Sequence, residues 1–197
     1  ISLSATALAR LADALRLSAP ERAYVFELTR RRDPAPHSLA EAVTEVPPEL
    51  GAALRSMSGP AYLLDRLWCA RDWNEPAAHL FQGWLGGEER NLLRYVFLDP
   101  AAPAFIHDWE DRARRILAEF RADTAHNPDD LRMKALVQDL QGQSAAFSRF
   151  WAEHAVLARE GGTRLFNHPQ DGRLRYEQLT LVPAAHPDLK LVMLLPE

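Results

Sequence analysis

The sequence contains little cysteine, little lysine and no long apolar run, and these absences exclude several classes of protein. One cysteine in 197 residues excludes an internal disulfide framework, and a reducing compartment is the simplest setting. No apolar run approaches the roughly 20 residues of a membrane span. The chain does not open with a charged stretch, an apolar run and a cleavage site, so no secretion signal is indicated. With 47% hydrophobic and 25% charged residues, we expect a cytoplasmic globular protein of one domain or slightly more.

Motifs of the common enzyme classes are also missing. The seven histidines are scattered, and none shows the His-x-x-x-His spacing of a zinc protease. There is no Gly-x-Ser-x-Gly elbow, no Walker loop and no Gly-x-Gly-x-x-Gly. Cys69 lies in a candidate strand without a neighbouring histidine, which favours a small buried residue over a nucleophile. The run of residues 107–111 is better explained as the solvent-exposed start of a helix than as a metal site. We therefore expect no enzyme, no metal site and no resident cofactor.

The basic residues are nearly all arginine and are unevenly distributed. Lys134 and Lys190 are the two lysines, so 21 of the 23 basic residues are arginines, a bias that a GC-rich genome alone explains. Residues 1–34 carry a net charge of +2, and the remaining residues sum to −6. A mildly basic start before an acidic body fits a segment close to nucleic acid that is joined to a different module.

The first part of the chain predicts two short helices followed by a linker. Apolar residues at helical spacing predict an amphipathic helix over 5–16, with one face formed by Leu8, Leu11, Ala12 and Leu15. Ser18 and Glu21 have the spacing of a capping box for a second helix. Four prolines after it indicate a linker. We therefore expect a two-helix segment over 1–32, a linker over 33–46 and a main domain over 47–197. Because the chain begins with Ile1 rather than Met, we expect a piece of a longer protein.

The main domain is predicted to begin with helices and one hairpin. Residues 61–65 and 67–73 have strand-like composition, with a turn at Asp65-Arg66. Asn74 can cap the helix that follows, and Pro76 fits its first turn. Further helices are expected over 50–57 and 88–97, from Asp99-Pro100 to Phe120, from Asn127-Pro128, and from Ser144.

The end of the chain predicts strands. The expected segments are 156–160, 163–168, 173–182 and 189–195. In the third of them, Leu174 and Tyr176 share one parity whereas Leu179 and Leu181 share the other, so we expect a bulge or bend near Glu177-Gln178. The order of elements predicts the α+β class: an antiparallel sheet of about five strands with helices packed on one face.

Aromatic residues are concentrated in the middle of the chain. Most are expected to fill a core. A helix layer over a curved sheet can also enclose a largely apolar pocket with a few polar groups at its mouth. The residues concerned include Trp68, Trp73, Phe81, Trp84, Tyr95, Phe97, Phe105, Trp109, Phe147, Phe150 and Trp151.

Several runs along residues 47–195 resemble one known family. They are residues 68–74, the run from Arg90 to Pro100, Trp109-Glu110, residues 150–154, His168-Pro169 and Gly172-x-Leu174-x-Tyr176-x-x-Leu179. Together they resemble the ligand-binding domain of MmyB-like bacterial transcription regulators. Two positions depart from the family pattern: Ala155 stands where an Asp is common, and residues 169–171 are poor in apolar side chains.

The resemblance implies a PAS-like fold behind an Xre-type helix-turn-helix domain, with a fatty acid as ligand. Residues 1–32 then resemble the last two helices of the Xre-type domain. A fatty acid needs an apolar pocket and a donor for its carboxylate, for which a guanidinium is well suited. Arg90 is the first choice for this donor, with Asn91 beside it, because both precede an apolar helix in the most distinctive run. An exposed or capping role for Arg90 is the alternative. The other candidate lining residues are Trp73, Phe97, Phe105, Trp109, Trp151 and His154, of which the last also fits a hydrogen-bonded core histidine.

These observations favour a sensor whose ligand changes the geometry of an upstream DNA-binding module in a homodimer. The alternative is a PAS-like module without a ligand that serves dimerisation or protein contact, with the aromatic residues as its core. A haem- or flavin-binding PAS-like domain is a third class, for which no axial ligand stands out. A cavity in the interior would favour the sensor, and a filled interior would favour the alternative.

Overall fold

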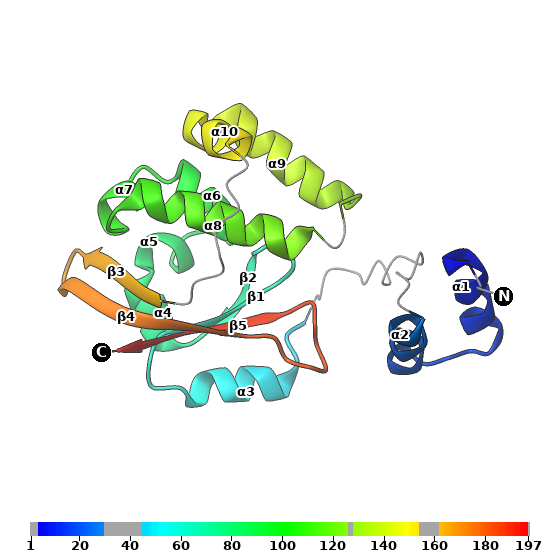
Figure 1. The fold of residues 1–197 in the computed structure, drawn as a ribbon. Coiled ribbons are helices and arrows are strands. Elements are labelled where there is room, and N and C mark those ends of the chain that lie inside the picture. Colours follow the sequence, from blue (N-terminus) through cyan, green and yellow to red (C-terminus); the bar gives the residue numbers. More distant parts are fainter. Residues whose placement is uncertain (1–3, 30–44, 126–127, 154–161, 197) are drawn as a thin grey trace. The chain divides into compact units, whose positions relative to one another are not determined.

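The computed structural model describes residues 4–29, 45–125, 128–153 and 162–196, which fall into two compact units, 1–44 and 45–197 (Figure 1). Each unit is considered by itself. Most of the predicted linker, the predicted strand over 156–160, Asn127 and His154 lie outside the described residues.

The first unit contains α1 (Ala5–Ala14) and α2 (Ala19–Leu28). Ser4 caps α1 by accepting a hydrogen bond from the backbone N–H of Ala7. Half of the predicted capping box is present, because the carboxylate of Glu21 accepts from the N–H of Ser18 at 2.8 Å. Two members of the predicted apolar face, Leu11 and Leu15, are exposed, whereas Leu8 and Ala12 are buried.

The second unit is built on a five-stranded antiparallel sheet, which confirms the predicted α+β class. The strand order is β2-β1-β5-β4-β3. The strands are β1 (Ala61–Leu64), β2 (Ala70–Trp73), β3 (Gly162–His168), β4 (Gly172–Leu181) and β5 (Lys190–Pro196). β1 and β2 form the predicted hairpin, and β5 places the C-terminal residues beside β1.

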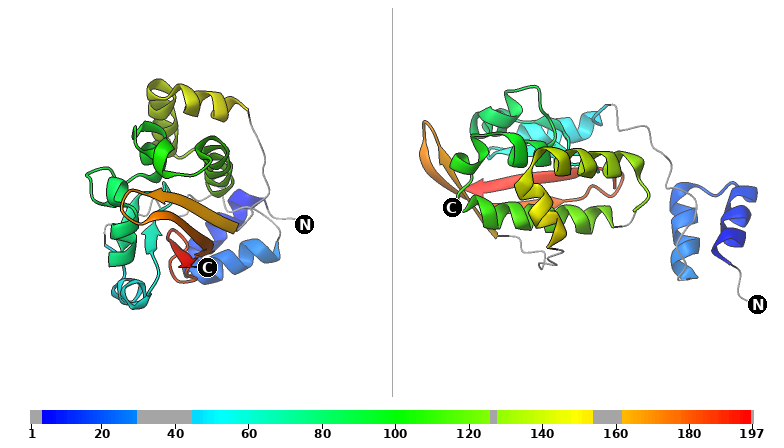
Figure 2. Two further views of the ribbon diagram at one scale, coloured as in Figure 1. Left: turned by 90° about the vertical axis from the view of Figure 1, so that its left-hand side faces the viewer. Right: turned by 90° about the horizontal axis from the view of Figure 1, so that it is seen from above.

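Helices cover both faces of this sheet, although unequally. Figures 1 and 2 show α8, α9 and α10 on one side of the sheet and α3 (Pro48–Ser56) on the other. Leu54 of α3 packs against Ala61, Leu63 and Leu191 on β1 and β5. The larger layer comprises α4 (Glu75–Leu80), α5 (Gln82–Leu85), α6 (Leu92–Leu98), α7 (Ala102–Phe105), α8 (Trp109–Thr124), α9 (Leu131–Gln143) and α10 (Ala145–Ala152).

Two predicted helices have bounds in the structure that differ from the predicted ones. The helix expected from Asp99-Pro100 to Phe120 is two helices, because Ile106 pairs with Phe166 of β3 and Asp108 takes a left-handed φ of 49°. The helix expected over 88–97 begins at Leu92, because Asn91 caps it and pairs with Cys69.

The bulge expected in β4 is absent. β4 keeps an unbroken register with β3 and with β5. Leu174 and Tyr176 therefore face the large helix layer, while Leu179 and Leu181 lie on the opposite face, 42% and 47% exposed. The parity change in the sequence reflects an outer face of β4 that α3 leaves open to solvent.

Asn74 joins three elements at the edge of the sheet. Its side-chain oxygen accepts from the N–H groups of Ala61 and Ala77, both at 3.0 Å. Its amide nitrogen donates to the carbonyls of Met57 and Gly59 at 3.1 and 2.8 Å. The predicted N-cap of α4 therefore also fixes the end of α3 and the start of β1.

Replacing Asn74 with Ala is expected to lower the free energy of unfolding by about 3 kcal/mol, because buried donors and acceptors lose their partners. The control is Ser144→Ala, which removes the single cap of α10 and should lower it by about 1 kcal/mol. Urea unfolding measures both, and equal losses would show that Asn74 acts only as a helix cap.

Candidate functional site: a charged cavity beneath α8

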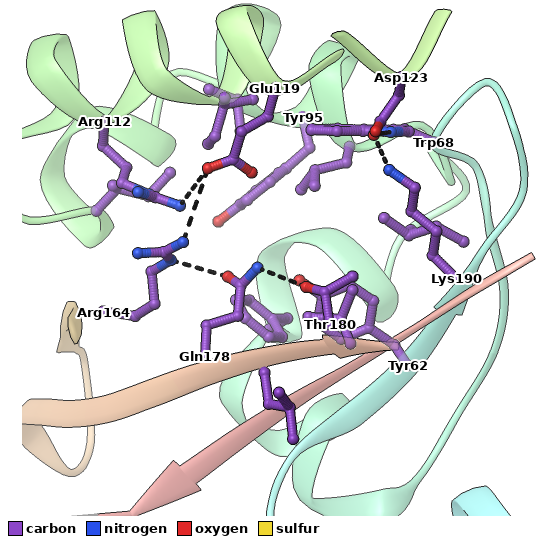
Figure 3. Close-up of a pocket in the computed structure, with 18 of the residues that line it drawn as sticks. Tyr62, Trp68, Tyr95, Arg112, Glu119, Asp123, Arg164, Gln178, Thr180 and Lys190 are labelled. Atoms are coloured by element: carbon purple, nitrogen blue, oxygen red, sulfur yellow. Dashed lines mark hydrogen bonds and ion pairs between the residues drawn. The ribbon is translucent and has the colours of Figure 1, made fainter. Parts of the chain in front are cut away.

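A cavity of about 330 Å³ lies between α8 and the sheet (Figure 3). This volume is at the lower end of the range for small-molecule sites. Most of its wall is apolar or aromatic and comes from the sheet, from α6 and from the segment around α7. Representative residues are Tyr62, Leu64, Tyr95, Phe105, Phe166 and Val192.

The register of α8 determines which of its side chains reach the cavity. Four of them line it with spacings of four, three and four residues, which keeps them on one helix face: Arg112, Ile116, Glu119 and Asp123. The fully apolar positions Ala113, Leu117 and Phe120 are buried on the neighbouring face. α8 therefore presents mostly charged groups to the sheet side.

Two guanidiniums and one carboxylate meet at one end of the cavity (Figure 3). Arg112 comes from α8, and Arg164 comes from β3, where alternation places it on the same face as Phe166. The Nη2 atoms of Arg112 and Arg164 each lie 3.9 Å from Oε1 of Glu119. The Arg164 side chain is 7% exposed, and its Nε donates to Gln178 at 2.8 Å. One carboxylate thus faces one buried and one partly buried cation.

Burial shifts the pKa values at this end. Desolvation, followed by the like charge of Arg164, lowers the pKa of Arg112 to about 10. Desolvation also lowers the pKa of Arg164. Both groups remain protonated at neutral pH, because an arginine guanidinium keeps its proton in proteins. The cluster therefore carries a net charge of +1.

The other end of the cavity holds a balanced pair. The ammonium of Lys190 contacts the carboxylate of Asp123, which also accepts from the indole N–H of Trp68 at 3.1 Å. Burial lowers the pKa of Lys190 to about 8, and the negative charge of Glu119 partly opposes this shift. Trp68 reaches this position with a left-handed φ of 62°, which is unusual for a bulky residue.

Between the two ends, the polar groups are neutral. The Tyr62 and Tyr95 side chains line the cavity, and burial raises the pKa of both hydroxyls. Both are therefore uncharged at neutral pH. The space between the charged ends suits an apolar ligand.

The structure places the predicted carboxylate donor outside this cavity. The guanidinium of Arg90 donates to the carbonyl of Gly87 and lies 4.9 Å from the ring centre of Trp73. Asn91 caps α6 by accepting from the N–H of Arg94 at 3.1 Å, and it donates to the carbonyl of Leu67 at 2.7 Å. None of these residues belongs to the described cavity wall.

Of the other predicted lining residues, Phe105 is on the cavity wall. Phe97 and Trp109 pack together within the helix layer, with ring centres 6.0 Å apart, and Trp151 stacks on Phe147. His154 lies outside the described residues. The structure thus brings Phe105 to the cavity, places Phe97, Trp109 and Trp151 in the helix layer, and places Trp73 at the end of β2. Whether those residues touch a ligand stays a prediction.

Comparison with known families now identifies the second unit. The family model described as "MmyB-like transcription regulator ligand binding domain" matches residues 46–197. The chain belongs to this family. The predicted resemblance is therefore confirmed. A search of the curated proteins gives no match. Among the described helices, none has the length and apolar character needed to cross a membrane.

The sequence did not lead us to predict the charged residues that line the cavity of this MmyB-like domain. The signal was the presence of Arg112, Glu119 and Asp123 at helical spacing beside an apolar stripe. Arg164 gave a second signal, because it shares the parity of buried Phe166 on β3. Each of these charged residues, taken alone, would be expected on the solvent-exposed surface. Their proximity becomes visible only in the folded structure.

A second cluster, formed by His79, His168 and Asp171, has the composition of a metal site. In His168, however, Nε2 lies 3.1 Å from the carbonyl of His79, and Nδ1 accepts from the N–H of Asp171 at 3.1 Å. Both ring nitrogens are thus engaged with the backbone. This histidine stabilises the β3–β4 turn against α4.

Replacing Glu119 with Leu is expected to lower the free energy of unfolding by about 2 kcal/mol, because two guanidiniums lose their counter-charge in a partly buried site. The matched control on α8 is Glu110→Leu, which removes exposed pairs with Arg114 and Arg149 and should change stability by less than about 1 kcal/mol.

A double-mutant cycle with Arg164→Leu tests the cause of this loss. The second substitution should recover part of the stability that Glu119→Leu removes, because one unpaired cation disappears. Strictly additive losses in urea unfolding would contradict the proposed charge arrangement.

Proposed function

We propose that this chain is the sensing part of a bacterial transcription regulator that binds a fatty acid or a similar hydrophobic small molecule. In this proposal the ligand modulates DNA binding by a helix-turn-helix domain upstream, of which residues 1–32 are the last helices, and the regulator acts as a homodimer. Membership of the MmyB-like family establishes a regulator with a ligand-binding domain. The single observation that carries the ligand proposal is the cavity beneath α8.

The chemistry of the cavity supports an acyl chain. Each buried methylene contributes about 0.8 kcal/mol, so ten of them contribute roughly 8 kcal/mol before the cost of association. Phe105, Phe166 and Val192 offer apolar contacts for such a chain. A ligand-free dimerisation module would need no internal space, and the presence of the cavity therefore favours the sensor.

Saturated fatty acids of about 12 to 18 carbons are expected to stabilise the purified chain. At a ligand concentration of about 100 times Kd, the free energy of unfolding should rise by about 2.7 kcal/mol, which raises Tm by roughly 5–10 °C for a domain of this size. Differential scanning fluorimetry and native mass spectrometry with lipid extraction measure this.

The control is Ile116→Trp, which fills the cavity from α8. This variant should fold and show no ligand-dependent change in Tm. A wild-type chain without co-purifying lipid and without any thermal shift would contradict the ligand proposal.

The regulatory step needs its own experiment, because tight binding alone changes no conformational equilibrium. The full-length gene product should change its affinity for its operator DNA when the fatty acid is added. The Ile116→Trp form should bind DNA without responding to the fatty acid. Equal DNA affinity with and without bound ligand in the wild type would show that the ligand is not the regulatory signal.

A further inference from the structure

The two guanidiniums at the end of the cavity share one carboxylate, Glu119, as their ion-pair partner, so this three-residue cluster has a net charge of +1; the charges of Glu177 and Arg115 also act on it, but from outside the cluster. Arg112 and Arg164 approach the same carboxylate oxygen of Glu119, each at 3.9 Å. This distance exceeds that of a hydrogen bond, so Glu119 provides charge without saturating either group. Within the described part of the chain, no other carboxylate forms an ion pair with these two arginines.

We propose that Arg112 and Arg164 form a clamp for the carboxylate of a monoanionic amphiphile, whose chain then lies beneath α8. The clamp rests on the proposed function, because it assigns the polar end of the same ligand site. It replaces Arg90 as the carboxylate donor.

Arg164 is oriented for this role by its other contacts. Its Nε donates to Gln178 at 2.8 Å, and its Nη1 donates to the carbonyl of Gly162 at 3.1 Å. Gln178 is held in turn by Thr180 at 3.2 Å. These bonds fix the plane of the guanidinium and leave Nη2 pointing to the region between Arg112 and Glu119 (Figure 3). An arginine fork positioned in this way matches a carboxylate.

The charge count selects the class of head group. Two guanidiniums and Glu119 sum to +1, so one added negative charge makes the cluster neutral. A dianionic phosphate monoester would leave an excess negative charge in a largely apolar cavity, next to the Glu119 carboxylate. An alcohol or an ester would leave the positive charge unbalanced. The cluster therefore suits a carboxylate best.

The orientation of the ligand in the cavity follows from the charges at the other end of the cavity. There the charge of Lys190 is already met by Asp123. Arg112 and Asp123 are eleven residues apart on α8, which corresponds to about 16 Å along the helix axis. The head group lies at the Arg112 end, and the chain extends past Ile116 toward the wall formed by Tyr95 and Val192.

The test compares three probes of equal chain length by isothermal titration calorimetry: tetradecanoic acid, 1-tetradecanol and tetradecyl phosphate. The wild-type chain should bind the acid at least tenfold more tightly than the alcohol. Arg112→Gln and Arg164→Gln should each weaken binding of the acid tenfold or more and leave binding of the alcohol within about twofold. The alcohol also serves as the folding control, because it needs an intact cavity.

Two further variants make the test specific. Arg114→Gln removes a guanidinium from the same helix that pairs with Glu110 and Glu153 outside the cavity, so both affinities should stay unchanged. Glu119→Gln raises the charge of the cluster to +2, so it should strengthen binding of the acid and bring tetradecyl phosphate within tenfold of it.

The outcomes separate the clamp from the proposed function. If acid and alcohol bind the wild type equally, or if Arg112→Gln and Arg164→Gln leave the difference unchanged, the clamp is wrong and the hydrophobic site remains. If Arg90→Gln abolishes the preference for the acid while Arg164→Gln does not, the carboxylate site is at Arg90 and the clamp is again wrong. If no probe binds the wild type, both proposals fail.

Discussion

The short pairing between Ile106 and Phe166 is the constraint on which the candidate site depends. The N–H of His107 donates to the carbonyl of Leu165 at 3.2 Å, so the chain is held against β3 just before α8 begins. This contact ends α7, and the left-handed Asp108 then starts α8 in a new direction. The start of α8 determines which residues face the sheet. Its charged face consequently lies over β4 and β5, and the cavity lies between them.

Because α8 turns its charged face toward the sheet, charged side chains are partly or fully buried at positions where apolar residues would pack well. A cluster such as Arg112, Glu119 and Arg164 contributes little to stability, because desolvation offsets much of the attraction between the charges. Similar apolar residues would fill the same space at no such cost. Stability alone therefore does not explain the ion-pair network, whereas the proposed role in binding a carboxylate does.

Much of the fold followed from local patterns. Asn74 and Ser144 each begin a helix as expected, and the hairpin of β1 and β2 could be predicted from strand-like residues around Asp65-Arg66. These features depend on residues within a few positions of one another. The break between α7 and α8 could not be predicted, because its cause is a strand far along the chain. The bulge in β4 was expected from an assumption that apolar residues must face one core.

The same reasoning explains why the site was harder to predict than the fold. Phe105 could be chosen because aromatic residues line pockets, but Phe97 and Trp109 satisfy the same rule inside the helix layer. Arg90 was preferred for its place in a family-like run, whereas its guanidinium lies against Trp73 and the carbonyl of Gly87. A charged site residue is recognisable only with its partner, and the partners here come from a helix and a strand that meet in three dimensions.

The position of the cluster also indicates how a bound ligand could be coupled to the rest of the regulator. Glu119 belongs to α8 and Arg164 to β3, so the ion pair between them joins the helix layer to the sheet. A carboxylate held between Arg112 and Arg164 would add a second anion to this junction and bring both guanidiniums to hydrogen-bonding distance. Arrangements of α8 against β3 that change the distance between Arg112 and Arg164 would then bind the ligand with different affinities. A difference of this kind is the thermodynamic requirement for a ligand to shift a conformational equilibrium.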